Sequence, residues 1–109
     1  MSKNEEYILN ILLKENIKFI REKTFSDLRK GKYRFDFYLP KYNTCIEFDG
    51  AYHYKKQPHV TEEQFKEQCK RDKIKDNYCK NNGIKLIRIP YWTLYNKKYK
   101  NILKKNTLI

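Results

Sequence analysis

Two short segments, Arg34–Leu39 and Thr44–Asp49, constrain the fold of this chain most, because apolar and polar side chains alternate along both. Alternation with a period of two is typical of β-strands that bury one face. Pro40 ends the first segment, and a turn at Tyr42–Asn43 leads into the second. The sequence therefore predicts a hairpin of two antiparallel strands.

The same period predicts which side chains share a face of this hairpin. In the first strand one face carries Arg34, Asp36 and Tyr38, and the other carries Phe35, Phe37 and Leu39. In the second strand one face carries Cys45, Glu47 and Asp49, and the other carries Ile46 and Phe48. Pairing would bring Asp36 and Glu47 together on one side of the sheet. Two facing carboxylates repel each other unless a cation or a shared proton lies between them, and Mg²⁺ or Mn²⁺ prefers such oxygen ligands.

The residues before the hairpin predict a helix and a further strand. Ser2-x-x-Glu5 is a capping box that opens an amphipathic helix ending near Asn16. Residues 17–25 follow as a strand, and residues 26–31 form a polar turn. This strand adds a third member to the predicted sheet.

The residues after the hairpin predict a crossover back to the sheet. A loop over residues 51–60 carries both histidines, and a capping box at Thr61-x-x-Gln64 opens a long helix that ends at Asn82–Gly83. Residues 84–90 form the last strand. A final basic helix is marked by Leu94, Tyr95, Tyr99, Ile102 and Leu103. The order α-β-β-β-α-β-α predicts an α/β domain with a mixed sheet flanked by helices.

Length and cysteine content bound the class of protein. The chain of 109 residues is long enough for one domain, spanning residues 1–109, with one hydrophobic core. No stretch approaches the length of a transmembrane helix, so we expect a soluble, intracellular protein of the cytoplasm. Cys45, Cys69 and Cys79 form no close pair and lack zinc-ligand spacing, which favours reduced thiols. A zinc site assembled in three dimensions is the alternative.

The formal net charge of +12 at pH 7 indicates a polyanionic partner. A surface this basic attracts nucleic acid through counterion release. Tyr91, Tyr95 and Tyr99 lie close to lysines in the sequence, a mixture that suits phosphate contact combined with base stacking. Lysines that only keep the surface solvated are the alternative, and no helix-turn-helix or zinc-finger motif is visible.

The acidic residues of the hairpin resemble a motif of the PD-(D/E)XK nuclease superfamily. The motif consists of Asp36 near the end of one strand and Glu47-x-Asp49-Gly50-x-x-His53 on the next. The chain is most similar to the very-short-patch-repair-like branch, which includes phage-type homing endonuclease domains. The resemblance covers the whole chain and implies a restriction-endonuclease-like α-β-β-β-α-β core followed by a C-terminal helix.

Two positions depart from the family pattern. Phe35 precedes Asp36 where the family name has proline, and Asp49 stands where a typical member has its catalytic lysine. In the repair-like branch, histidine and additional acids take over the work of that lysine. His53 is placed for this role, and Lys75 on the long helix is the other candidate. If neither serves, the chain is an inactive relative that binds DNA.

The resemblance implies a metal site in the hairpin. Asp36 and Glu47 would hold Mg²⁺ or Mn²⁺, and the backbone carbonyl of Phe48 would be a further ligand. The competing interpretation of Asp36 is an acid near a turn that pairs with Arg34 or with a nearby lysine.

Three further residues are implied to be catalytic, and each has a structural alternative. Asp49 would bind the metal or orient His53, although Asp49–Gly50 is also a common strand-ending turn. His53 would activate water or protonate the leaving oxygen, unless it is an ordinary loop histidine. Glu5 corresponds to an acid on the first helix of the branch, although it is also explained as a helix cap, and Glu6 could serve instead.

The basic residues implied to contact DNA are Arg34, Arg71, Arg88, Lys97 and Lys98. Arg71, Asp72 and Lys75 would lie at the edge of the active site, unless Asp72 and Lys75 form a structural pair on their own helix. Arg88 would contact phosphate or neutralise buried acids, and these alternatives stay open. The lysines near the C-terminus serve DNA backbone contact or solubility.

The function that these residues imply is a metal-dependent DNA endonuclease, associated with a phage or mobile element. Water would attack the phosphodiester in line and leave 5′-phosphate and 3′-hydroxyl ends. Cutting both strands would need a homodimer, sequential nicks or a larger nucleoprotein partner. The alternatives are a catalytically inactive nucleic-acid-binding module of the same fold and, less favoured, a small basic structural protein.

Overall fold

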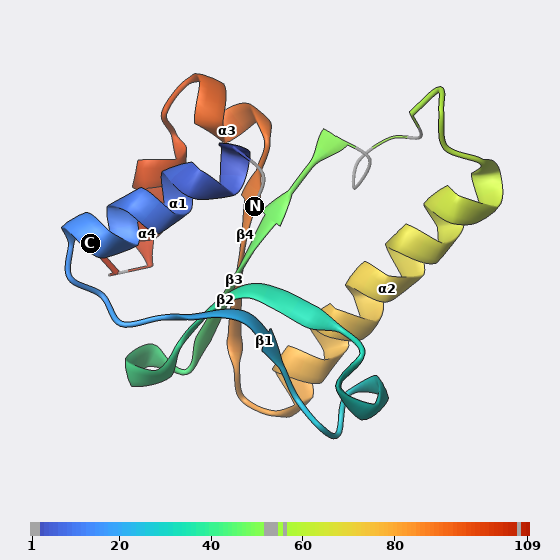
Figure 1. Ribbon diagram of the computed structural model, residues 1–109, viewed down its shortest axis with the longest axis horizontal. Coiled ribbons are helices and arrows are strands. Elements are labelled where there is room, and N and C mark those ends of the chain that lie inside the picture. The colour runs from blue at the N-terminus through green and yellow to red at the C-terminus, as the bar shows by residue number, and fades with distance from the viewer. Residues whose placement is uncertain (1–2, 52–54, 56, 107) are drawn as a thin grey trace.

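A mixed sheet of four strands, in the order β1-β2-β3-β4, lies at the centre of the structure (Figure 1). The strand β2 (Arg34–Leu39) pairs antiparallel with β1 (Ile20–Thr24) on one side and with β3 (Thr44–Asp49) on the other. The last strand, β4 (Lys85–Pro90), runs parallel to β3. The parallel pairing arises because α2 (Glu62–Asn81) forms the crossover between β3 and β4. The predicted hairpin and the mixed α/β class are therefore confirmed.

This computed structural model describes residues 3–51, 55, 57–106 and 108–109. Two short 3-10 turns, Arg29–Gly31 and Pro40–Tyr42, precede β2 and β3. Among the described helices, none is long and apolar enough to cross a membrane.

Three helices cover one face of the sheet: α1 (Lys3–Lys14), α3 (Trp92–Tyr95) and α4 (Tyr99–Lys105) (Figure 1). Their apolar side chains meet those of β2, β3 and β4 in the larger of two hydrophobic clusters. Its fully buried members include Ile8, Leu12, Phe37, Ile46 and Leu103. Burial of this apolar surface is the main force that holds these helices on the sheet.

The helix α2 covers the opposite face. Its N-terminus carries the predicted capping box, in which Gln64 N–H donates to Thr61 Oγ1 at 3.1 Å and Thr61 N–H donates to Gln64 Oε1 at 3.0 Å. A smaller cluster beneath the helix includes the buried thiols of Cys45 and Cys79. Both are free, as is the exposed Cys69, so the expectation of reduced thiols agrees with the structure.

The single C-terminal helix that the sequence predicts is instead two helices, α3 and α4, which are separated by a turn. Lys97 adopts a left-handed conformation, with φ of 61°, which a continuous helix excludes. The side chain of Asn96 accepts a hydrogen bond from Lys98 N–H at 3.0 Å and stabilises this turn. Tyr99 begins α4 and is buried in the larger cluster, so it is not available for base stacking.

The strict alternation predicted for β2 is wrong at Phe35. Phe35 packs in the cluster beneath α2, whereas Phe37 and Leu39 pack on the other face against α1. The face changes at Asp36, where the pairing with β1 skips Glu22 and the pairing with β3 ends at Phe37. Glu22 has a φ of 51°, which interrupts the regular β1 strand opposite Asp36.

The two adjacent leucines of α1 test how this helix packs on the sheet. Leu12 is 0% exposed and Leu13 is 60% exposed. We predict that Leu12→Ala lowers the free energy of unfolding by about 2–5 kcal/mol, because it leaves a cavity in the core. Leu13→Ala should change it by no more than about 0.5 kcal/mol. Urea denaturation measures both, and equal losses would contradict the packing described for α1.

Candidate functional site

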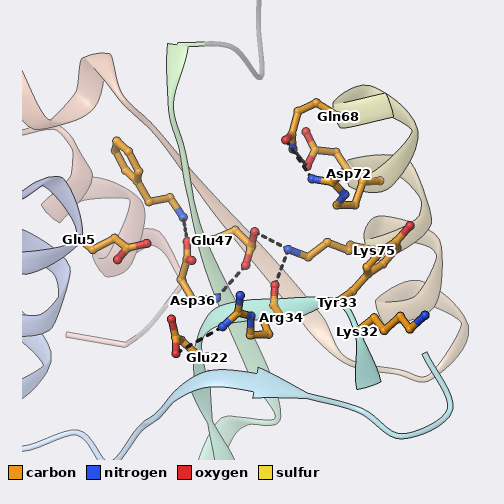
Figure 2. Close-up of a pocket in the computed structure, with 12 residues that line it drawn as sticks. Glu5, Glu22, Lys32, Tyr33, Arg34, Asp36, Glu47, Gln68, Asp72 and Lys75 are labelled. Carbon is orange, nitrogen blue, oxygen red and sulfur yellow. Dashed lines mark hydrogen bonds and ion pairs between the residues drawn. The ribbon is translucent and has the colours of Figure 1, made fainter. Parts of the chain in front are cut away.

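The strands β2 and β3 separate at Asp36 and Glu47, and the two carboxylates fill the gap (Figure 2). The backbone N–H of Asp36 donates to Glu47 Oε1 at 2.8 Å, and the backbone N–H of Phe48 donates to Asp36 Oδ2 at 2.7 Å. Each carboxyl group thus accepts a hydrogen bond from a backbone N–H of the opposite strand, in place of the carbonyl oxygen that would accept it in a regular β-sheet. The structure brings together the two acids that the sequence singled out.

Lys75 reaches this pair from α2. Its ammonium lies 2.8 Å from Glu47 Oε2 and also donates to the carbonyl oxygen of Arg34 at 2.6 Å. The side chain is buried and passes over the ring of Phe35, with Nζ 4.8 Å from the ring centroid. Lys75 therefore pairs with Glu47 on the sheet and not with Asp72 on its own helix.

Burial and mutual repulsion perturb both acids. The pKa of Asp36 is raised from 3.8 to about 8, first by burial and then by the carboxylates of Glu47 and Glu5, against the hydrogen bond from Phe48 N–H. Burial also raises the pKa of Glu47, although the ammonium of Lys75 opposes this shift. Among the ion pairs of the described residues, none involves Asp36. Of these acids, Asp36 is therefore the one whose ionised form is least stabilised by positive charge among the described residues.

Glu5 approaches the same site from α1, on the other side of Asp36 (Figure 2). Its Oε2 lies 3.4 Å from Arg21 Nη2 of β1. Glu6 is exposed and does not line the pocket, so of these two acids it is Glu5 that reaches the site. Its alternative role as a partner of Ser2 falls outside the described residues.

The acids form one wall of a pocket of about 540 Å³ between α1, the sheet and α2. Basic residues of the same pocket are Lys32, Arg34, Arg71 and Lys75. Arg34 Nη1 lies 3.8 Å from Glu22 Oε2, and the guanidinium of Arg71 lies 6.0 Å from the ring centroid of Tyr33. The pocket thus combines buried carboxyl groups with basic side chains around them.

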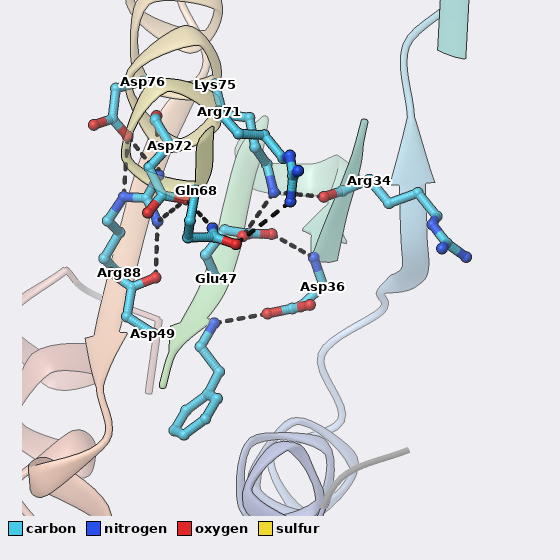
Figure 3. A network of polar contacts seen from close by, with 11 residues as sticks. Arg34, Asp36, Glu47, Asp49, Gln68, Arg71, Asp72, Lys75, Asp76 and Arg88 are labelled. Atoms are coloured by element: carbon cyan, nitrogen blue, oxygen red, sulfur yellow. Dashed lines mark hydrogen bonds and ion pairs between the residues drawn. The ribbon is translucent and has the colours of Figure 1, made fainter. Parts of the chain in front are cut away.

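Arg88 of β4 organises a second charged group beside the pocket (Figure 3). Its Nη1 lies 2.8 Å from Asp49 Oδ1, its Nη2 lies 2.7 Å from Asp76 Oδ1, and Asp72 Oδ1 lies 4.0 Å from Nη1. Burial lowers the pKa of Arg88, but the carboxylates of Asp49 and Asp76 outweigh it and the pKa is raised. Arg88 thus forms ion pairs with the buried Asp49 and with the exposed Asp76, which agrees with the alternative of neutralising a buried acid. Its contact with phosphate stays a prediction.

Asp49 is consequently tied to Arg88 and does not line the pocket with Asp36. Lys97 and Lys98 are exposed in the turn between α3 and α4, also away from the pocket lining. The prediction for His53 falls outside the described residues. The site residues predicted by sequence therefore divide into a pocket group, an Arg88 group and a distant basic turn.

Within the described ranges, no group of three or more His, Cys, Asp or Glu side chains is arranged to hold a metal ion. The expected Mg²⁺ or Mn²⁺ site thus depends on the carboxylates of Asp36 and Glu47, with Phe48 also lining the pocket.

Several pocket residues were missed by sequence reasoning, namely Glu22, Lys32, Tyr33 and Gln68. Lys32 and Tyr33 directly precede the Arg34–Leu39 strand, and this position was an available signal. Gln68 lies one helical turn before Arg71 and Asp72, and its Nε2 donates to Asp72 Oδ1 at 3.0 Å. Nothing in the sequence predicted that Glu22 lines the pocket, because its position depends on the interruption of β1.

The chain shares sequence with a viral protein. A protein of invertebrate iridescent virus 6, named uncharacterized protein 307L, is 40% identical over 70 residues, which cover 57% of this chain and 36% of the viral protein. The chain thus spans about a third of the length of this relative. No protein-family model matches the chain, and no solved structure matches it.

The raised pKa of Asp36 predicts how stability depends on pH. Between about pH 4 and 8 the folded protein retains a proton that the unfolded chain releases, so its free energy of unfolding falls as pH rises. The slope from this group is at most about 1.4 kcal/mol per pH unit. Denaturation in EDTA should show a shallower pH dependence for Asp36→Asn than for the wild type or for Glu63→Gln, an exposed control. The same dependence of unfolding free energy on pH in all three proteins would contradict the raised pKa of Asp36.

Proposed function

We propose that this protein is a metal-dependent DNA endonuclease of the PD-(D/E)XK type, similar to the very-short-patch-repair-like branch. The observation that carries the proposal is the meeting of Asp36, Glu47 and Lys75 where β2 and β3 separate. In the family motif the lysine follows the second acid on the same strand, at the position of Asp49 here. Lys75 brings an equivalent ammonium to Glu47 from α2.

The donor atoms of the pocket are oxygens of the kind that Mg²⁺ or Mn²⁺ prefers. Asp36 and Glu47 would hold it, together with the backbone carbonyl of Phe48, and Glu5 would add negative charge nearby. Asp36 has no ion-pair partner among the described residues, so a cation would relieve the repulsion between the acids. When bound, Mg²⁺ or Mn²⁺ would polarise the scissile phosphate and favour ionisation of the attacking water.

The basic residues of the pocket would act on the phosphate groups. Lys32, Arg34 and Arg71 would attract the DNA backbone and fix its position without reading sequence. Lys75, held by Glu47 and by the Arg34 carbonyl, would offset negative charge that develops on the phosphate as water attacks in line. His53 stays the candidate for proton transfer. Cleavage would leave 5′-phosphate and 3′-hydroxyl ends, by analogy with the superfamily.

A catalytically inactive nucleic-acid-binding module is the second candidate. Its supporting observation is that Glu47 is already paired with Lys75, which neutralises one of the two proposed ligands. The viral relative supports an association of this protein with a virus or mobile element, where it would act on intracellular DNA. A homodimer is proposed only if the protein cuts both strands.

Cleavage of supercoiled plasmid separates the two candidates. We predict relaxed circles with Mg²⁺ or Mn²⁺ and none with EDTA. Asp36→Asn, Glu47→Gln and Lys75→Met should each lower the rate by about 100-fold or more. The first two remove a proposed ligand of the cation, and the third removes the ammonium that would offset charge on the phosphate.

The exposed-acid variant Glu63→Gln should cut at the wild-type rate. Circular dichroism must show that each variant is folded. Wild-type protein that binds the plasmid but leaves it intact with both metals would reject catalysis and favour the inactive module. Full activity in folded Asp36→Asn would place the chemistry elsewhere.

A further inference from the structure

Two large aromatic side chains of α3 are exposed to solvent. Trp92 is 44% exposed and Tyr95 is 76% exposed, although aromatic side chains of this size are mostly buried in folded proteins. Tyr91 lies edge-to-face with both, at 5.3 Å from the Trp92 ring and 6.5 Å from the Tyr95 ring. These three rings form one group on the surface, and none of them lines the acidic pocket.

The backbone beneath these rings is held firmly. Tyr91 N–H donates to the carbonyl of Asp49 at 2.9 Å, and Thr93 Oγ1 donates to the carbonyl of Pro90 at 2.6 Å. Leu94 anchors the short helix in the larger hydrophobic cluster. The exposed rings are therefore presented from a fixed base, which limits the entropy lost when a ligand stacks on them.

The charge around the rings favours a polyanion over a protein partner. Residues 77–109 contain no aspartate or glutamate. Lys97 and Lys98 are exposed in the turn that follows Tyr95, and Lys100 is exposed in the first turn of α4. Exposed aromatic rings beside lysines form the usual surface for single-stranded nucleic acid, in which base faces stack and phosphates meet positive charge.

We propose that a surface around α3 binds single-stranded DNA by stacking unpaired bases on Trp92 and Tyr95. This α3 surface consists of Tyr91, Trp92, Tyr95, Lys97 and Lys98. Duplex DNA does not fit this surface as well, because its base faces are covered and α3 has four residues, too few for a recognition helix in the major groove. Stacking on Trp92 and Tyr95 uses the ring faces, whereas Lys97 and Lys98 meet the backbone phosphates.

The α3 surface lies close to the candidate active site. Asp49, to which Tyr91 is bonded, follows Glu47 by two strand residues, which span about 7 Å. The backbone that carries the α3 surface is therefore hydrogen-bonded directly to the strand that carries Glu47. Binding at α3 does not depend on cleavage, so each proposal can fail without the other.

Trp92 is the chain's single tryptophan, so its fluorescence reports on this surface alone. The full chain is titrated in EDTA with three probes of equal length, about 10 nucleotides: oligothymidine, an abasic oligonucleotide and a blunt duplex. We expect oligothymidine to quench Trp92 and the abasic strand to leave it unquenched, because only the former has bases. Equal quenching by the abasic strand or by the duplex would overturn stacking of unpaired bases, as would no quenching.

Variants separate stacking from charge. Trp92→Ala and Tyr95→Ala should each weaken binding of labelled oligothymidine by about 5- to 150-fold, measured by anisotropy, and Trp92→Phe should retain most of it. Lys97→Ala should instead reduce the salt dependence of binding. Tyr42→Ala is the matched control, since Tyr42 is 39% exposed beside Lys41 at the opposite end of β3.

An affinity unchanged by both aromatic variants would contradict the proposal, and so would an equal loss in Tyr42→Ala. Trp92 fluorescence that changes with protein concentration without DNA would instead assign the surface to a second copy of the chain.

Discussion

The buried ion pair between Lys75 and Glu47 is the interaction on which the candidate site depends. It joins α2 to β3, and the second hydrogen bond of Lys75 reaches β2 through the Arg34 carbonyl. Burying two charges is costly, and removing one partner of such a pair typically costs about 3–5 kcal/mol. An apolar pair of similar volume would hold α2 on the sheet without this cost. The buried charges of this pair are therefore better explained by the proposed chemical role than by packing alone.

The distribution of counter-ions explains why Asp36 differs from its neighbours. Glu47 is paired with Lys75, Asp49 with Arg88, and Glu5 with Arg21. Asp36 accepts a hydrogen bond from Phe48 N–H and lies close to two other acids. The local fold thus leaves one carboxyl group of the pocket without a counter-ion among the described residues, and the raised pKa of Asp36 is the consequence. This position is where a divalent cation would be most favourable.

The sequence predicted those parts of the fold that depend on local pattern. Alternation identified the hairpin, and the Thr61-x-x-Gln64 spacing identified the start of α2, because both signals lie within a few residues. Features that depend on distant residues could not be predicted. Glu47 could have been paired with several cations, and the choice of Lys75, 28 residues away, is made only by the crossover of α2.

The two wrong predictions of the fold have different physical origins. The change of face at Asp36 follows from the separation of β2 from β3, and the break before α4 follows from the left-handed conformation of Lys97. Helical periodicity in the C-terminal residues gives no sign of this break. The sequence could offer ion pairing as one alternative for Arg88, but its partners Asp49, Asp72 and Asp76 become visible only in the structure.

Binding of Mn²⁺ to the folded protein is a direct test of a metal site at Asp36 and Glu47, because it does not require the correct DNA substrate. Free Mn²⁺ is measured by electron paramagnetic resonance in titrations of wild type, Asp36→Asn, Glu47→Gln and the Glu63→Gln control. We expect saturable binding by the wild type and by Glu63→Gln, and loss of binding in both pocket variants. Binding that is absent from the wild type, or that persists unchanged in folded Asp36→Asn, would contradict a metal site at the separated strands.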